Sequence, residues 1–446
     1  MGFTLQKATL NPPALPPGDD DAGIPWVLLD EHAYVAERQN ATTAVSTTWN
    51  DKKVQVTFSL AHPPRVSYLC VFCPEAEITL EPKILATEDD IVLLRIIVSS
   101  RKGIDILKDV DYFVYEANAA AGPSLTRLPR PPSPYGFESY DVGILRCRTN
   151  HGQRRSILRA HRDNAGDFYV VAGLCKDFYQ LGPGQFVLCL YNSKQPGAWS
   201  INTVSLDEQQ RLQHGRYFHH VNTNVISVGG DNGTMGFVDL WHGILFCDVL
   251  RVEASPVLRY VTLPPPILPV VPDMVDARLF RDIAVIGDRI KYVELQVRWE
   301  PCPVFEREYI MDGWESATWS RPVAATSPGD DWDPGFTRKS SHVPVDSNPH
   351  FELLPRVLDD ENMPLPPFTR VHICQPTLSL QDGDTVYFMT KIRRGDAKAW
   401  VIAVDMRNNA LQGVAEFAAE RTTDGSFTYV HSRISKYLTM APGNYV

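Results

Sequence analysis

Residues 244–264 read ILFCDVLRVEASPVLRYVTLP, and the pattern that decides the fold lies in this stretch. Ile244 to Asp248 is an apolar run that ends in a polar residue, a loop follows, and Val257 to Pro264 is a second apolar run that ends in Leu-Pro. Short apolar runs of this kind, bounded by turn residues, are typical of β-strands. The same order recurs along the chain, where the first strands are Asp111–Glu116, Val187–Tyr191, Tyr292–Val297 and Val401–Asp405.

Other parts of the chain keep a period of two. Val54 to Leu60 alternates between apolar and polar residues, as a half-buried strand does. Residues 231–233 (DNG) and 382–384 (DGD) predict tight hairpin turns, because Asn, Asp and Gly tolerate a positive φ. Only Leu206–Gln213 and Ala415–Ala419 have patterns that predict helices. The sequence therefore predicts an all-β fold.

The spacing of the repeats favours one β architecture over another. The copies are centred near residues 114, 189, 246, 294 and 403. Kelch-like propeller blades run about 50 residues, and a closed ring of blades leaves no long exposed strand edge. We therefore expect a β-propeller of about five to seven blades with long loop insertions. Two stacked β-sandwich domains are the alternative.

Composition predicts the domain boundaries. Residues 1–23 are rich in Pro and Asp and are expected to form a flexible tail. Residues 24–440 are expected to form a single propeller-like β domain, in which residues 324–370 are a loop insertion rich in Pro, Asp and Ser. Residues 441–446 are then a short C-terminal tail.

Charge and cysteine usage exclude several classes of protein. The chain of 446 residues has 43 Lys and Arg against 53 Asp and Glu, a net charge of −10, so nucleic-acid binding is not expected. The sequence lacks a signal-peptide pattern and an apolar run long enough to span a membrane. Eight scattered cysteines do not make a disulfide framework, and Cys70-Val71-Phe72-Cys73 lacks a second ligand pair for zinc. We expect reduced cysteines without metal and a cytoplasmic or nuclear location.

The usual catalytic and cofactor motifs are missing. Neither a Gly-x-Ser-x-Gly elbow nor a His-Glu-x-x-His zinc motif occurs, and Gly229–Gly236 lacks the Lys of a phosphate loop. His219 and His220 could bind a metal with Asp231 or Asp239, but adjacent residues of a strand point to opposite faces. The sequence therefore predicts no catalytic residue, no cofactor and no metal ligand.

One cluster of basic residues stands out in this acidic chain. It precedes the strand that begins at Phe168, contains few aromatic residues, and predicts an exposed loop that contacts an acidic protein partner rather than single-stranded nucleic acid. The candidate partner-binding residues are Arg146, Arg148, Arg154, Arg155 and Arg159.

Several phrases together resemble a known protein family. They are IPWVLLD (24–30), EPKIL (81–85), VLLR (92–95), GFVDLWHGILFCD (236–248), RYVTLP (259–264), RDIAV (281–285), IKYVEL (290–295), ATWS (317–320), KAWVIAVD (398–405) and HSRISKYL (431–438). The sequence resembles the plant domain of unknown function 1618 family, which is expanded in grasses. The resemblance implies a plant source and gives no catalytic residue. It is also similar to the propeller domains of F-box proteins, but no F-box helix is visible, so recruitment to a ubiquitin ligase is not expected.

Two functional hypotheses follow. The first is an intracellular protein-interaction module without chemistry of its own, whose partner binds to loops on a rigid scaffold. The alternative is a hydrolase-like enzyme with its site at the mouth of the propeller, since propellers carry both kinds of function. The residues that line the central channel should distinguish them, because convergent carboxylates or histidines there would favour an enzyme.

Overall fold

The computed structural model describes most of the chain between residues 5 and 438. The residues in that range that it does not describe are 15–22, 102, 118–121, 149–165, 176–181, 216–217, 252–256, 268–274, 302–308, 325–330, 345–349, 358–362, 364, 366–367, 369, 394, 419–420 and 422–427. The expected arginine loop therefore lies largely outside the described residues, and so do both ends of the chain.

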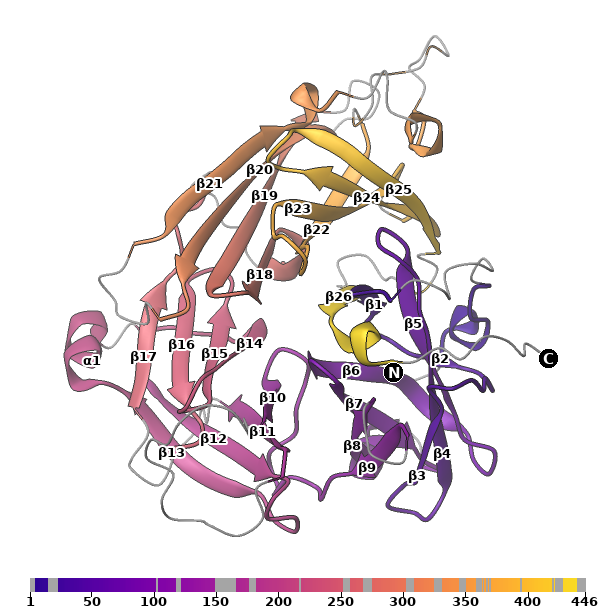
Figure 1. The fold of residues 1–446 in the computed structure, drawn as a ribbon, viewed down its shortest axis with the longest axis vertical. Coiled ribbons are helices and arrows are strands. Elements are labelled where there is room, and N and C mark those ends of the chain that lie inside the picture. Colours follow the sequence, from indigo (N-terminus) through magenta and orange to yellow (C-terminus); the bar gives the residue numbers. More distant parts are fainter. Residues whose placement is uncertain are drawn as a thin grey trace.

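Five groups of four strands, called sheets I to V below, follow one another along the chain, and within each group successive strands are antiparallel neighbours (Figure 1). Sheets II and III are joined edge to edge into one eight-stranded sheet. Sheet I contains β6 (Ile78–Glu88), β7 (Ile91–Val98), β8 (Val110–Glu116) and β9 (Ser124–Arg127). Sheet II contains β10 (Val142–Cys147), β11 (Phe168–Cys175), β12 (Gln185–Asn192) and β13 (Ser200–Leu206). Sheet III contains β14 (Asn224–Gly229), β15 (Thr234–Asp239), β16 (Gly243–Asp248) and β17 (Val257–Thr262). Sheet IV contains β18 (Arg281–Ile286), β19 (Arg289–Pro301), β20 (Tyr309–Pro322) and β21 (Asp333–Lys339), and sheet V contains β22 (His372–Leu378), β23 (Thr385–Lys391), β24 (Lys398–Asp405) and β25 (Ala410–Ala418).

The sixth sheet joins the two ends of the described chain. Its strand order is β26-β1-β5-β4-β3, and β2 also pairs with β5. The pairing of β26 with β1 is antiparallel, with Val27 opposite Ser432 and Asp30 opposite Tyr429. Sheet VI contains β1 (Val27–Asp30), β2 (Tyr34–Val35), β3 (Ala44–Thr47), β4 (Lys53–Ser59), β5 (Val66–Phe72) and β26 (Tyr429–Ser432).

The sheets follow one another around a ring (Figure 1). The first strands of sheets I to V contact one another in succession, and β22 also contacts β26. Sheets II and III are additionally joined by a parallel pair, β13 with β17. The all-β prediction is confirmed. The arrangement is compatible with the expected propeller, with these six sheets as its blades, and neighbouring sheets pack face to face.

The apolar cores lie between neighbouring sheets. Phe246 and Val238 of sheet III pack with Ile283 and Tyr292 of sheet IV in one cluster of buried residues. A similar cluster joins sheets I and II and includes Tyr112. Because each sheet is covered on both faces by its neighbours, its strands read as near-continuous apolar runs. This packing explains why runs such as Ile91 to Val98 keep so few polar residues.

Helices are short in the part of the chain that the structure describes. α1 (Glu208–His214) confirms the helix predicted near Leu206–Gln213, and the Asp207 side chain caps it by accepting from the Gln210 N–H at 3.0 Å. None of the described helices is long and apolar enough to cross a membrane. The short 3₁₀ helices are η1 (Lys7–Leu10), η2 (Gly103–Asp109), η5 (Ala277–Leu279), η6 (Ser340–His342), η7 (Phe351–Leu353) and η8 (Ile434–Tyr437).

The second predicted helix is wrong. The described part of Ala415–Ala419 belongs to β25, where Ala415 lies opposite Val401 of β24. Ala, Glu and Phe fit a helix locally, but cross-strand pairing overrides this weak preference. The segment 324–370, expected as a loop, also contains β21, which pairs with β20.

Candidate functional site

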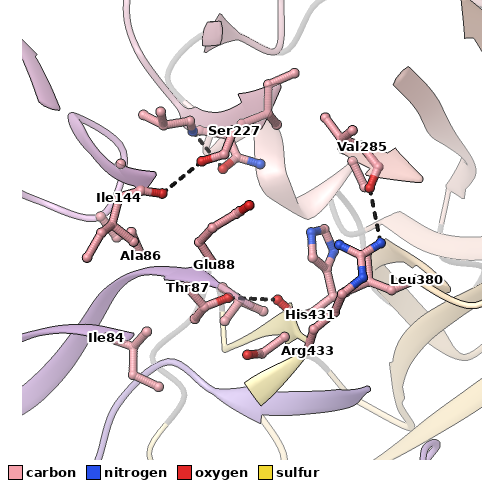
Figure 2. A pocket seen from close by; sticks show the side chains of 18 of the residues that line it. Ile84, Ala86, Thr87, Glu88, Ile144, Ser227, Val285, Leu380, His431 and Arg433 are labelled. Carbon is pink, nitrogen blue, oxygen red and sulfur yellow. Dashed lines mark hydrogen bonds between the residues drawn. The ribbon is translucent and has the colours of Figure 1, made fainter. Parts of the chain in front are cut away.

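A cavity of about 370 Å³ lies where the first strands of the sheets meet (Figure 2). Its lining includes residues of β6, β10, β14, β18, β22 and β26, so every sheet contributes to it. This volume is within the range of about 300–1,000 Å³ that is usual for small-molecule sites. We call it the axial cavity.

One wall of the axial cavity is a buried ion-pair network around Glu31. The carboxylate of Glu31 lies 3.6 Å from Lys83 Nζ and 3.4 Å from Arg278 Nη1, and it accepts a hydrogen bond of 2.6 Å from the Ser139 hydroxyl. Burial alone would raise the pKa of Glu31, but the two cations hold it below its usual value. Because two cations offset its charge and its Oε1 makes all three contacts, Glu31 is a structural link between sheets I and VI and the η5 segment.

Asp282 and His431 form a second polar contact in the cavity. The Asp282 carboxylate accepts a hydrogen bond of 2.9 Å from the Leu378 N–H and lies 3.6 Å from His431 Nδ1. Thr87 reaches across from β6 and donates to the backbone carbonyl of His431 at 3.4 Å. These contacts connect sheets I, IV and V to β26, so this part of the cavity is fixed by the strand that closes the ring.

Glu88, the last residue of β6, points into the cavity beneath Ser227 (Figure 2). Burial, with a contribution from the neighbouring Asp89, raises the pKa of Glu88 to about 8, and Arg433 and Ser227 only partly oppose this effect. At neutral pH the carboxyl is therefore mainly protonated and can donate a hydrogen bond. The pKa of Glu88 is about 4.5 in the unfolded chain and about 8 in the folded chain, so the folded chain binds its proton more tightly. The contribution of Glu88 to stability is therefore lost as the pH rises from about 4.5 to about 8.

Arg433, which directly follows β26 near the C-terminal end of the described chain, also lines the cavity (Figure 2). Among the described residues, its guanidinium has one hydrogen-bond partner, the Val285 carbonyl, to which Nη2 donates at 3.3 Å. A guanidinium has five N–H groups, so this contact leaves donors for a ligand. Glu88 and Arg433 thus bring a neutral acid and a cation to one cavity.

The structure describes two of the five predicted arginine residues, and both contact Asp90. Arg146 is the penultimate residue of β10, is 10% exposed, and pairs with Glu116 at 2.7 Å and Asp90 at 3.2 Å. Arg148 is 42% exposed and contacts Asp89 and Asp90 at 3.3 and 3.2 Å. Arg154, Arg155 and Arg159 lie outside the described residues. Both described arginines are therefore bound to acids of sheet I, and partner binding by this cluster stays a prediction.

The cysteine pair lies at the end of β5. Cys70 and Cys73 are both buried and free, and burial raises the pKa of the Cys70 thiol to about 11. A thiol with a raised pKa is a poor nucleophile and a poor metal ligand, because both roles require the thiolate. This environment fits a packing role for the pair.

A family model matches residues 237–387. It is the model of DUF1618, described as a protein of unknown function. The resemblance in the sequence is confirmed over this stretch. The DUF1618 match begins in β15 and ends in β23, so it includes all of sheet IV and parts of sheets III and V.

No curated protein matches the chain in sequence. A levansucrase mutant of B. megaterium is similar in structure at 11% identity and a TM-score of 0.24, over 86% of this chain and 91% of that one. MPT-1, a GDP-Man-dependent mannosyltransferase from Leishmania mexicana, is similar at 9% identity and a TM-score of 0.20, over 71% of this chain and 80% of that one. Similarities at these TM-scores carry no argument about fold or activity.

Proposed function

We propose that this chain is a binding domain that holds a small carboxylate in the axial cavity. The observation that carries the proposal is the pair of donors at Glu88 and Arg433, which face one cavity from different sheets. A carboxylate accepts hydrogen bonds only, and the guanidinium fork matches its two oxygens. The Ser227 and Thr87 hydroxyls in the same lining already donate to the Ile144 and His431 carbonyls, so Glu88 and Arg433 are the donors on which the proposal rests.

The walls of the cavity limit the kind of carboxylate. The described lining contains no Phe, Tyr or Trp, and its one ring, the His431 imidazole, lies beside Asp282, so the cavity offers little stacking surface to a nucleobase or a sugar ring. Ile84, Ile144, Val285 and Leu380 supply aliphatic surface around the polar groups (Figure 2). A short aliphatic acid fits these walls, with its carboxylate at Glu88 and Arg433 and its hydrocarbon part on the aliphatic side chains.

A hydrolase is less well supported. A general base needs a nucleophile or a water within hydrogen-bond reach of its free atom. Asp282 accepts from the Leu378 N–H and lies beside His431, and Glu31 Oε1 accepts from Ser139 and Arg278. Asp282 and Glu31 thus already contact cationic side chains, a histidine, a hydroxyl and the backbone, which favours a structural role for them over catalysis.

The test is a titration of the full-length chain with butyrate, followed by ligand-observed NMR and calorimetry. We expect Arg433→Ala to weaken butyrate binding roughly tenfold to a hundredfold, the effect of losing a charge-assisted hydrogen bond of about 1.5–3 kcal/mol. Arg407→Ala is the matched control, because Arg407 is an exposed arginine that pairs with Asp384 on the surface. Butyramide, which has no charge, should bind much more weakly than butyrate.

The pH dependence of this binding has a defined sign. Glu88 donates to the ligand only while protonated, so butyrate should bind below a pH of about 8 and be lost as the pH rises through that value. In Glu88→Gln, which donates at every pH, the loss should disappear. Equal binding by wild type and Arg433→Ala, or equal binding of butyrate and butyramide, would contradict the proposal.

Protein recognition is the second candidate, and one exposed side chain favours it. Trp49 is 55% exposed, and the guanidinium groups of Arg127 and Arg130 lie 5.2 and 5.0 Å from its ring centre. Trp and Arg dominate the binding energy of protein interfaces, and two cations here suit an acidic partner segment. Capture of a fluorescent poly-glutamate peptide should weaken in Trp49→Ala and persist in Trp299→Ala, another exposed tryptophan. Unchanged capture by Trp49→Ala would rule out this surface.

An intracellular location also remains a proposal, supported by the free cysteines.

A further inference from the structure

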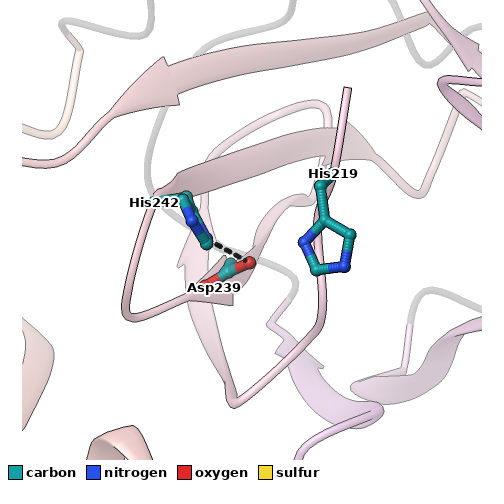
Figure 3. Close-up of side chains that lie close together, drawn as sticks. All are labelled: His219, Asp239 and His242. Carbon is teal, nitrogen blue, oxygen red and sulfur yellow. Dashed lines mark hydrogen bonds and ion pairs between the residues drawn. The ribbon is translucent and has the colours of Figure 1, made fainter. Parts of the chain in front are cut away.

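We propose that His219, Asp239 and His242 form a binding site for a divalent transition-metal ion such as Zn²⁺. One ligand atom from each of the three side chains lies within 4.8 Å of the other two (Figure 3). This site lies at the turn between β15 and β16 and is independent of the axial cavity.

The backbone brings the three side chains together. Asp239 ends β15 and His242 directly precedes β16, and the His242 N–H donates to the Asp239 carbonyl at 3.0 Å across the tight turn between them. The segment that carries His219 runs beside this turn, because Val221 N–H donates to Asp239 Oδ2 at 2.9 Å and Thr223 N–H donates to the Val238 carbonyl at 2.7 Å. The two segments are therefore held in place by hydrogen bonds of the protein itself.

The distances are close to those that a metal site needs. His242 Nδ1 lies 3.0 Å from Asp239 Oδ2, and the rings of His219 and His242 are centred 6.0 Å apart. Ligand atoms about 2.0–2.2 Å from a tetrahedral zinc ion lie roughly 3.3 Å from one another. A bound ion would thus replace the hydrogen bond between His242 and Asp239 after an opening of a few tenths of an ångström. Rotation of the exposed His219 side chain closes the remaining gap.

The donor set selects the class of ion. Two imidazoles and one carboxylate suit Zn²⁺ and related transition metals, whereas Ca²⁺ and Mg²⁺ prefer sites made of oxygen atoms alone. The Asp239 carboxylate is almost fully buried, and the backbone N–H groups of Val221 and Trp241 orient it at 2.9 Å each. Both histidines are exposed, so solvent reaches the site. Three protein ligands leave the fourth position of a tetrahedral ion open to water or to a ligand.

The sequence pattern pointed to His220 as the second imidazole of a metal site, whereas the structure places His242 beside His219 and Asp239. His219 and His220 are adjacent and do not share one site, because His220 is buried, with Nε2 3.1 Å from Asn222 Oδ1. The second imidazole comes instead from His242, which the hairpin turn places beside Asp239. The prediction of no metal ligand rested on His219 and His220, and His242 lies 22 residues beyond His220 along the chain.

The experiment is a Zn²⁺ titration of the full-length, chelator-treated chain, measured by competition with a chromophoric chelator. We expect one high-affinity site per chain, and an affinity at least about tenfold weaker in His219→Ala and in His242→Ala. His342→Ala, which removes another exposed histidine, is the matched control and should bind normally. His219→Ala changes only an exposed side chain, so a folding defect is not expected, and circular dichroism checks this.

A Co²⁺ titration distinguishes this site from the cysteines. Binding at His219, Asp239 and His242 should give a visible d–d spectrum without the ultraviolet charge-transfer band of cobalt–thiolate bonds. A thiolate band that disappears in Cys70→Ser would place the metal at the Cys70–Cys73 pair and overturn the proposal. Absence of a high-affinity site in the wild type, or wild-type affinity in both histidine variants, would also overturn it.

Discussion

Replacing Arg281 by alanine should lower the free energy of unfolding by about 3–5 kcal/mol, the usual effect of leaving one partner of a buried ion pair without the other. Arg281 and Glu294 are 2% and 0% exposed, and their side chains lie 3.3 Å apart. Arg281 also donates to the Leu240 carbonyl at 2.8 Å and lies over the Trp241 ring at 4.5 Å. The substitution would thus leave Glu294 buried without its cation and remove a link between sheets III and IV.

Chemical denaturation of the two variants Arg281→Ala and Arg289→Ala tests this expectation. Arg289 begins the neighbouring strand and pairs with Asp333, but both side chains are much more exposed, at 32% and 66%. A surface ion pair contributes about 0–1 kcal/mol, so Arg289→Ala should change stability little. Similar losses in both variants would contradict the view that burial of the pair, rather than its charge alone, sets the cost.

Ending the chain after residue 427 should prevent cooperative folding. The truncation removes β26, the only described strand that pairs with the outer edge of β1. It also removes Tyr429 and Ile434, both fully buried, from the cores beside sheets V and VI. Loss of a buried aromatic and a buried aliphatic side chain costs roughly 2–5 kcal/mol each, a large part of the stability of a whole domain. The exposed edge of β1 should then promote association of chains.

Size-exclusion chromatography and a thermal melt measure this effect. The control is a chain that ends after residue 438, which keeps β26 and η8. We expect the control to be folded and the shorter chain to aggregate or to melt without a cooperative transition. A shorter chain that remains monomeric and melts like the control would contradict the closure of the ring by β26.

The strands could be predicted because their signals are local. The alternation of Val54 to Leu60 corresponds to β4, and the run at Asp111–Glu116 corresponds to β8. The prediction that the first of these strands is half-buried was wrong, because Gln55 and Thr57 are buried as well. The turns were predictable for the same reason: Gly233 and Gly383 have φ values of 62° and 65°, the positive values that hairpin turns require. The helix expected at Ala415–Ala419 was wrong because its structure depends on β24, a neighbour that a local window does not include.

The axial cavity could not be predicted, because its residues meet only after the ring has closed. Glu88 and Arg433 lie near opposite ends of the chain, and neither belongs to a recognisable motif. The ion pairs of Arg146 could not be predicted either, because its partners are distant in the sequence. Its acidic neighbours Asp90 and Glu116 belong to another sheet, so a cluster that looks solvated in the sequence is partly a buried ion-pair network. The sequence shows where charged residues occur along the chain, but it does not show which residues of opposite charge lie beside them in the fold.

The most direct test of the central claim is a crystal structure of the chain grown with saturating butyrate near neutral pH. The account predicts electron density for the ligand in the axial cavity, with its carboxylate in hydrogen-bond contact with both Glu88 and Arg433 and its alkyl part against Val285 and Leu380. Density for butyrate at another place, with only water between Glu88 and Arg433, would contradict the account.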